Sequence, residues 1–206
     1  MSRSPTLIKG WSDVCVIGDE KVGKTAMIHL LTQGYYDINT KYEPTLEDSY
    51  ILHVASSLSV DKIKLKLLDT AGSNISYHHK RLPRHFIDQC AGFIIMYSVD
   101  RLESFNIAKM LVQEIKSVRK ENDCAIIVLG NKTDLIQYRC VSREDLQLLC
   151  NEENVYGDEV TVTDKSTFRA PLSHMVDDIF KCINEESERD IAKKRGVVHR
   201  KFSDLF

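Results

Sequence analysis

The feature that most constrains the fold of this 206-residue chain is a glycine-rich stretch at residues 18–25, which reads GDEKVGKT. It fits the pattern G-x-x-x-x-G-K-[ST]. It lies between an apolar run at 13–18 and a segment at 24–33 whose apolar residues recur at helical spacing. A strand, a tight loop and a helix in this order place backbone N–H groups and the positive end of a helix around phosphate. The stretch therefore predicts an α/β fold with a phosphate-binding loop.

Each residue type in this loop has an expected role. The two glycines allow the tight turn, Lys24 reaches the outer phosphates and the Thr25 hydroxyl can bind Mg²⁺. The alternative is a glycine-rich turn that carries a lysine by chance. We assign nucleotide contacts to the whole loop and the start of the helix, namely Gly18, Asp19, Glu20, Lys21, Val22, Gly23, Lys24, Thr25 and Ala26.

The rest of the chain continues the alternation of strands and helices. Apolar runs at 48–56 and 60–69 predict two strands joined by a bend. Continuous apolar runs at 91–99 and 124–130 predict central parallel strands that are covered on both faces. Helical spacing of apolar residues predicts further helices at 105–115 and 172–183. This order predicts a doubly wound α/β sheet with a ligand at the carboxyl ends of its strands.

Composition argues against several classes of protein. The formal net charge of −2 gives no general attraction to nucleic acid, and no run approaches the roughly 20 apolar residues that a membrane span needs. The six cysteines are scattered without a C-x-x-C pair, which favours buried reduced thiols over disulfides or a zinc site. We therefore expect one domain that binds no nucleic acid and lies in the cytoplasm, or in the nucleus as well.

Two further strand ends carry polar motifs. DTAG at 69–72 puts the Asp69 carboxylate where Mg²⁺ must be held and the Gly72 amide near the terminal phosphate. NKTD at 131–134 ends in Asp134, whose two acceptor oxygens match the ring N–H and the NH₂ of guanine but not the edge of adenine. Alone, Asp69 could cap a helix and NKTD could be a surface turn. Together the three motifs favour a guanine-nucleotide site over a P-loop kinase or ATPase.

With these motifs the sequence resembles the Ras-family small GTPases over about residues 11–184. The resemblance implies the P-loop small G-protein fold: a mostly parallel six-stranded sheet with one antiparallel edge strand and helices on both faces. It also implies GTP/GDP and Mg²⁺ as cofactors, and Thr45 as the switch threonine that holds the metal with Thr25 and Asp69. The effector loop would consist of Tyr42, Glu43, Pro44, Leu46, Glu47, Asp48, Ser49 and Tyr50.

The resemblance also assigns residues around the base. Tyr36 takes the place of the aromatic residue that stacks on guanine, with an ordinary core or surface tyrosine as the alternative. The base-binding motif would include Asn131 and Lys132 beside the guanine-selecting carboxylate. A last base-contacting loop has alanine as its usual middle residue, which contributes a backbone amide. Here the loop consists of Thr163, Asp164 and Lys165, so a carboxylate is added near the base.

Three positions around the reaction centre depart from the family pattern. Ser73 replaces the glutamine that orients the attacking water in fast members, and serine is too short to reach the same water. Glu20 and Lys21 replace small glycines, where they can obstruct the water or an activating arginine, or simply point to solvent. No basic residue other than Lys21 is assigned to neutralise Glu20. We place catalysis at Gly72, Thr45 and the degenerate Ser73, and predict slow hydrolysis.

The segment 73–89 corresponds to the second switch and is rich in basic residues and histidines. Its LPRH run at 82–85, the stretch at 86–93, the altered catalytic position and the lack of a lipidation motif resemble the NF-κB inhibitor-interacting Ras-like subgroup, κB-Ras. That resemblance implies IκB-type ankyrin-repeat proteins or Ral GTPase-activating complexes as partners. A solvated loop is the ordinary alternative, and a histidine metal or pH site is a further one.

We divide the chain into a flexible N-terminal extension at 1–10, a Ras-like G domain at 11–190 and a basic tail at 191–206. The tail carries no C-a-a-X motif, so no lipid anchor is expected. Its basic cluster suits an anionic membrane or an import receptor, although a flexible solvated tail is the preferred interpretation. The favoured function is a Mg²⁺-dependent GTP-binding signalling regulator with weak GTPase activity. A conventional GTPase restored by an activating partner, and a nucleotide-poor scaffold, are the alternatives.

Overall fold

In this computed structural model the backbone is described for residues 11–37, 47–58, 62–70, 82–120 and 123–203, and the side chains for all of these except 11, 47, 186–188 and 190–203. Strands alternate with helices along the chain, as the sequence predicts. In order the elements are β1 (Trp11–Gly18), α1 (Lys24–Gln33), β2 (Glu47–Val54), β3 (Ile63–Thr70), α2 (Arg84–Gln89), β4 (Gly92–Ser98), α3 (Leu102–Val118), β5 (Ala125–Asn131), η2 (Ile136–Tyr138), α4 (Arg143–Glu153), β6 (Tyr156–Glu159), η3 (Lys165–Phe168) and α5 (Arg169–Ser203).

The six strands form one sheet in the order β2-β3-β1-β4-β5-β6. The β2–β3 pair is antiparallel and every other neighbouring pair is parallel. β4 is buried along its whole length, which explains its continuous apolar run, whereas β3 buries Leu65 and Leu67 and exposes Lys64. The predicted fold class is therefore confirmed: a mostly parallel six-stranded sheet with one antiparallel edge strand.

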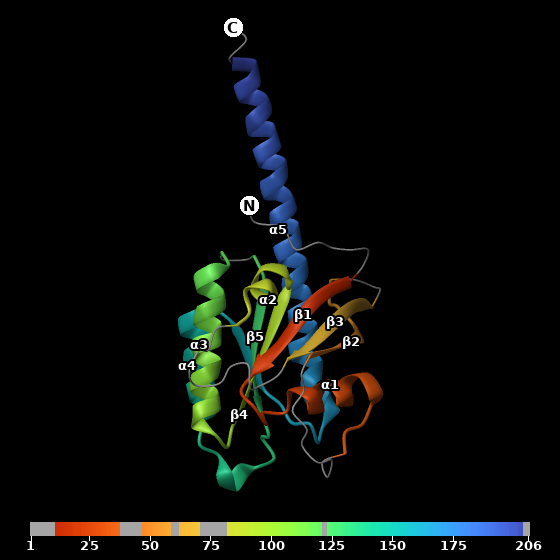
Figure 1. The fold of residues 1–206 in the computed structure, drawn as a ribbon, viewed down its shortest axis with the longest axis vertical. Helices are drawn as coiled ribbons and strands as arrows, with labels where there is room; N and C mark the ends of the chain where they lie inside the picture. Colours follow the sequence, from red (N-terminus) through yellow and green to blue (C-terminus); the bar gives the residue numbers. More distant parts are fainter. Residues whose placement is uncertain (1–10, 38–46, 59–61, 71–81, 121–122, 204–206) are drawn as a thin grey trace.

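Helices cover both faces of the sheet (Figure 1). Successive residues of β1 point to opposite faces: Val14 and Val16 join an apolar cluster with α1 and α5, while Cys15 and Ile17 join a second cluster with α2, α3 and α4. Each face of the sheet therefore has its own core. In a sheet of this kind a ligand is expected at the carboxyl ends of the parallel strands.

The turn after β2 is tied to α5 by one carboxylate. Ser56 Oγ donates to Asp177 Oδ1 at 2.7 Å, and the backbone N–H of Ser57 donates to the same oxygen at 3.2 Å. The Ser57 hydroxyl also donates to the second oxygen of Asp177. These bonds join the edge hairpin to the C-terminal helix.

Helix α5 continues to Ser203, so the prediction of a flexible tail is wrong for residues 191–203. The sequence there is rich in Lys and Arg, which favour a helix. Its apolar residues do not recur at helical spacing, so the pattern does not predict one. One turn before, Arg189 pairs with Glu185 at 3.1 Å and with Asp123 at 3.0 Å. The helix crosses the predicted boundary at 190 unbroken and projects from the body of the molecule (Figure 1). The predicted extension at 1–10 lies outside the described residues.

Three of the remaining expectations concern membrane, metal and thiols. Within the described ranges, no helix is both long and apolar enough to cross a membrane. No group of three His, Cys, Asp or Glu side chains is gathered around a metal-sized space in this part of the chain, while His78 and His79 lie outside it. All six cysteines are free, as predicted. Cys15 and Cys90 are buried as predicted, whereas Cys124, Cys150 and Cys182 are only half-buried and Cys140, which follows η2, is exposed.

Candidate nucleotide-binding site

The glycine-rich loop connects β1 to α1 and turns in a way that only glycine allows at two positions. Gly18 has a φ of +143° and Gly23 a φ of +99°. A Cβ on Gly18 would lie 2.1 Å from the Met96 carbonyl oxygen, and a Cβ on Gly23 would lie 2.3 Å from Asn131 Nδ2. The loop is therefore packed against the next strand and against the NKTD motif, and both glycines are needed for that packing.

Lys24 is a buried cation at the centre of this loop. The residue is 6% exposed, and its Nζ donates to the carbonyl oxygens of Gly18 at 3.0 Å and Asp19 at 2.8 Å. Burial lowers the pKa of Lys24 to about 8, although the nearby carboxylates of Asp69 and Asp19 act to raise it. Two carbonyl oxygens thus hold the ammonium group in place of the phosphate oxygens that the sequence predicts as its partners.

Thr25 and Asp69 come together as the metal prediction requires. The Thr25 hydroxyl donates to Asp69 Oδ2 at 2.6 Å, and Asp69 is fully buried at the end of β3. Its Oδ1 has no hydrogen-bond partner within the described part of the chain. Burial raises the pKa of Asp69, against the hydrogen bond from Thr25 and the charge of Lys24. A hydroxyl oxygen beside a carboxylate with an unused oxygen fits the donor set that Mg²⁺ prefers.

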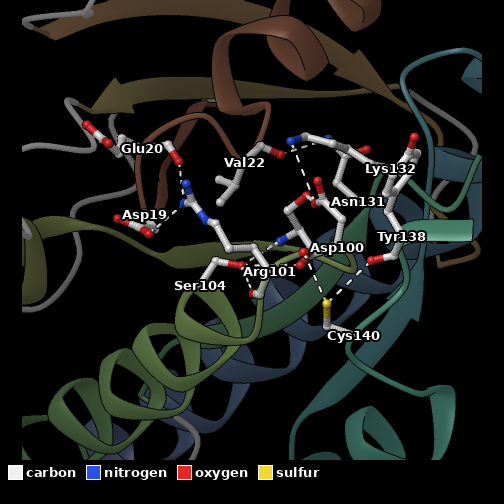
Figure 2. Close-up of polar contacts among 11 residues, drawn as sticks. Asp19, Glu20, Val22, Asp100, Arg101, Ser104, Asn131, Lys132, Tyr138 and Cys140 are labelled. Atoms are coloured by element: carbon white, nitrogen blue, oxygen red, sulfur yellow. Dashed lines mark hydrogen bonds and ion pairs between the residues drawn. The ribbon is translucent and has the colours of Figure 1, made fainter. Parts of the chain in front are cut away.

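The NKTD motif lies beside the phosphate loop, at the end of β5. Asn131 is fully buried, and its Nδ2 donates to the Val22 carbonyl oxygen at 2.8 Å (Figure 2). Lys132 has a φ of +64° and pairs with Asp100 at 3.8 Å. Asp134 is exposed, and its Oδ1 accepts from the Thr161 hydroxyl at 2.5 Å. The hydrogen bond between Asn131 and Val22 therefore joins the loop predicted for the base to the loop predicted for the phosphates.

The last predicted base loop follows β6, and its side chains mainly hold the protein together. Asp164 Oδ1 accepts from the Ser166 N–H at 2.9 Å, which caps η3. Hydrogen bonds from the Ser166 side chain and backbone lower the pKa of Asp164. Lys165 Nζ donates to the Leu31 carbonyl oxygen at 3.1 Å, on α1. The Thr163 hydroxyl lies 2.8 Å from that of Thr161. The additional carboxylate of Asp164 is thus used by its own short helix.

The predicted aromatic and effector residues are only partly described. Tyr36 is half-buried after α1, with its ring centroid 6.4 Å from that of His29. The His29 ring also contacts the ring of Tyr50 on β2, whose hydroxyl lies 3.2 Å from His29 Nε2. Asp48 and Ser49 are exposed on the same edge strand, and the backbone of Glu47 begins it. The predicted residues Thr45, Gly72, Ser73, Tyr42, Glu43, Pro44 and Leu46 lie outside the described ranges.

Arg101 is a residue of this site that the sequence analysis did not identify. It directly precedes α3, and its Nη2 donates to Asp19 Oδ2 and to the Glu20 carbonyl oxygen, both at 2.6 Å (Figure 2). The side chains of Glu20 and Lys21 are exposed, so the acidic group that the protein neutralises here is Asp19. The only sequence signal is the polar pair Asp100 and Arg101, which directly follows a buried apolar run.

The chain is similar to known proteins at two levels, a family and a subgroup. The sequence model of the Ras family matches residues 13–181. The chain is 38% identical over 160 residues to the NF-kappa-B inhibitor-interacting Ras-like protein 1 of Homo sapiens, covering 78% of this chain and 81% of that protein. The Danio rerio protein of the same name is 36% identical over 162 residues, with coverages of 79% and 82%. Human NF-kappa-B inhibitor-interacting Ras-like protein 2 is 30% identical over 162 residues, with coverages of 79% and 83%. The predicted resemblance to the κB-Ras subgroup is confirmed.

Proposed function

Because this chain belongs to the Ras family, we propose that it is a Mg²⁺-dependent GTP-binding signalling regulator that hydrolyses GTP slowly and acts through protein contacts of its GTP state. The observation that carries the proposal is the buried group of Lys24, Thr25 and Asp69, joined through Asn131 to the loop of Asp134. Burying an ammonium and a carboxylate costs free energy, and a nucleotide with its cation would offset that cost. A nucleotide-poor scaffold offers no such compensation.

Each described residue has a definite task in the proposed site. Lys24 would exchange its two carbonyl partners for phosphate oxygens, and Thr25 and Asp69 would hold the metal ion. Mg²⁺, when bound there, would neutralise phosphate charge. Asp134 would accept from the two N–H donors of guanine, with its carboxylate oriented by the hydroxyl of Thr161.

We infer slow hydrolysis from the sequence positions nearest the terminal phosphate. Ser73 cannot orient water as the longer glutamine does, and Glu20 brings a carboxylate to the phosphate loop. Gly72 and Thr45 remain suited to sensing the terminal phosphate. A conventional cycling GTPase is the alternative, in which an activating partner supplies the missing group.

The names of the relatives motivate the proposed partner. Those proteins are named for interaction with NF-kappa-B inhibitors. We therefore propose that this chain binds an IκB-type ankyrin-repeat protein in the cytoplasm or nucleus, with Ral GTPase-activating complexes as the second candidate. The exposed Asp48 and Ser49 of β2 offer a surface beside the nucleotide site for such a contact.

The nucleotide carried by gently purified protein tests the central proposal. We expect GTP or GDP, whereas ATP or the absence of nucleotide would contradict it. Asp134→Asn should lose GTP and gain xanthosine triphosphate, because xanthine presents an acceptor where guanine presents its NH₂. Asp178→Asn is the matched control, since Asp178 pairs with His174 and Lys181 on α5 and should leave nucleotide choice unchanged.

The same protein, loaded with nucleotide, is used to test the rate of GTP hydrolysis and the binding of a partner. Single-turnover hydrolysis should be slower than the roughly 3–5 × 10⁻⁴ s⁻¹ of Ras, and Ser73→Gln should raise it. In a pull-down, the GTP-analogue form should recover more ankyrin-repeat protein than the GDP form. A rate at or above the Ras scale would contradict slow hydrolysis, and equal recovery by both forms would contradict a GTP-gated contact.

A further inference from the structure

The contact between Arg101 and the phosphate loop is more constrained than a surface ion pair. One guanidinium nitrogen lies 2.6 Å from both a carboxylate oxygen of Asp19 and a backbone oxygen of Glu20. The Arg101 side chain is 33% exposed and that of Asp19 only 18%. Charge-assisted hydrogen bonds of this length are stronger than neutral ones, and partial burial protects them from screening by salt.

The backbone of Arg101 is held as firmly as its side chain. Its N–H donates to the Ser98 carbonyl oxygen at 3.0 Å, and its own carbonyl oxygen accepts from the Ser104 hydroxyl at 2.6 Å. Ser104 is fully buried at the start of α3 (Figure 2). The backbone that carries the guanidinium group is therefore fixed at the start of α3, on the sheet face covered by α2, α3 and α4. The side chain reaches the phosphate loop from there.

The charges of this loop show why such a cation matters. Asp19 and Glu20 bring two carboxylates next to the amides that a phosphate would use, and Lys24 is the buried cation. Arg101 and Asp19 act on Lys24 in opposite directions, so the three groups form one electrostatic cluster. Without Arg101, the carboxylate of Asp19 would face an incoming polyphosphate unpaired, and like charges at this range repel.

We propose that Arg101 is a positioning residue of the nucleotide site, which neutralises Asp19 and fixes the Glu20 carbonyl so that the loop can accept a polyphosphate. The proposal rests on the proposed function, because it concerns the same site. It predicts that the effect of losing Arg101 depends on the number of phosphates in the ligand. Repulsion by an unpaired Asp19 grows with the negative charge of the ligand, so GTP should suffer most from the loss of Arg101, GDP less and GMP least.

The test measures the affinity of the full chain for GTP, GDP and GMP by fluorescence titration. Arg101→Met keeps the length of the stem and removes the charge; it should weaken GTP binding about tenfold, GDP binding less, and leave GMP within about twofold of the parent. Arg143→Met is the matched control, because Arg143 pairs with Asp158 across 3.5 Å at an exposed position on α4. It should bind all three nucleotides like the parent.

A second change separates charge from structure. Adding Asp19→Ala to Arg101→Met should restore most of the GTP affinity, because the uncompensated carboxylate is gone, and Arg101→Lys should retain most of it. Amide hydrogen exchange of residues 19–23 in the nucleotide-free protein should be faster in Arg101→Met than in the parent, which is a readout independent of ligand.

The outcomes distinguish this inference from the function on which it rests. Equal loss for all three nucleotides, no rescue by Asp19→Ala, or exchange rates and affinities equal to the parent would overturn the role of Arg101 while leaving GTP binding intact. A parent that binds no guanine nucleotide would overturn the proposed function, and the positioning role with it.

Discussion

At the scale of single residues, the ionisation of Lys24 is open to direct measurement. Burial lowers its pKa to about 8, although Asp69 and Asp19 act to raise it. Phosphate oxygens would raise this pKa again, so binding takes up a proton once the pH exceeds about 8. GTP affinity should therefore be complete below this pH and should fall about tenfold by pH 9.

The control is Lys24→Arg, since arginine keeps its charge throughout this range. Whatever its absolute affinity, that variant should bind GTP equally from pH 7 to pH 9 in a fluorescence titration. A parent whose affinity is equally flat would show that Lys24 keeps its proton in the free site.

At the scale of elements, Asp177 is the described link between α5 and the turn after β2. Asp177→Ala removes the hydrogen bonds from Ser56 and Ser57, and it leaves the part-buried Ser56 hydroxyl without its acceptor. Hydrogen bonds to a charged group at a partly exposed site predict a loss of about 1–2 kcal/mol in the free energy of unfolding. Urea denaturation of the nucleotide-free protein would measure it.

Glu152→Ala provides the comparison for that measurement, because Glu152 is exposed on α4. It should change the free energy of unfolding by less than about 0.5 kcal/mol. If Asp177→Ala changed the free energy of unfolding equally little, its hydrogen bonds to Ser56 and Ser57 would not be what holds the hairpin against α5.

At the scale of the whole molecule, α5 sets the shape. Its 35 residues span about 52 Å at 1.5 Å per residue. A compact chain of 206 residues has a radius of gyration of about 17 Å, so small-angle X-ray scattering should give a larger value for this protein. A chain ending at residue 190 should scatter as a more compact particle, and equal radii would contradict a helix over 191–203.

The sheet, the phosphate loop and the NKTD loop were predictable because local patterns specify them. The continuous apolar run of β4, and the glycines and lysine of the phosphate loop, each mark one local structure. The Arg101–Asp19 contact was not predictable, since it depends on where the start of α3 lies in space relative to a loop 82 residues earlier. The partners of Asp134 and Asp164 were missed for a similar reason: many turn residues offer the same hydroxyl and amide donors.

The hydrogen bond from Asn131 Nδ2 to the Val22 carbonyl oxygen bears on how long a ligand would stay bound. A ligand held at one end by the phosphate loop and at the other by the NKTD loop touches two segments that are fastened to each other. Loosening of one loop would then be opposed by its hydrogen bond to the other, so release of such a ligand would be slower than from two independent loops. Such a site favours a long residence time. A molecule that breaks the hydrogen bond between Asn131 and Val22 would shorten the residence time without competing for the ligand's own contacts.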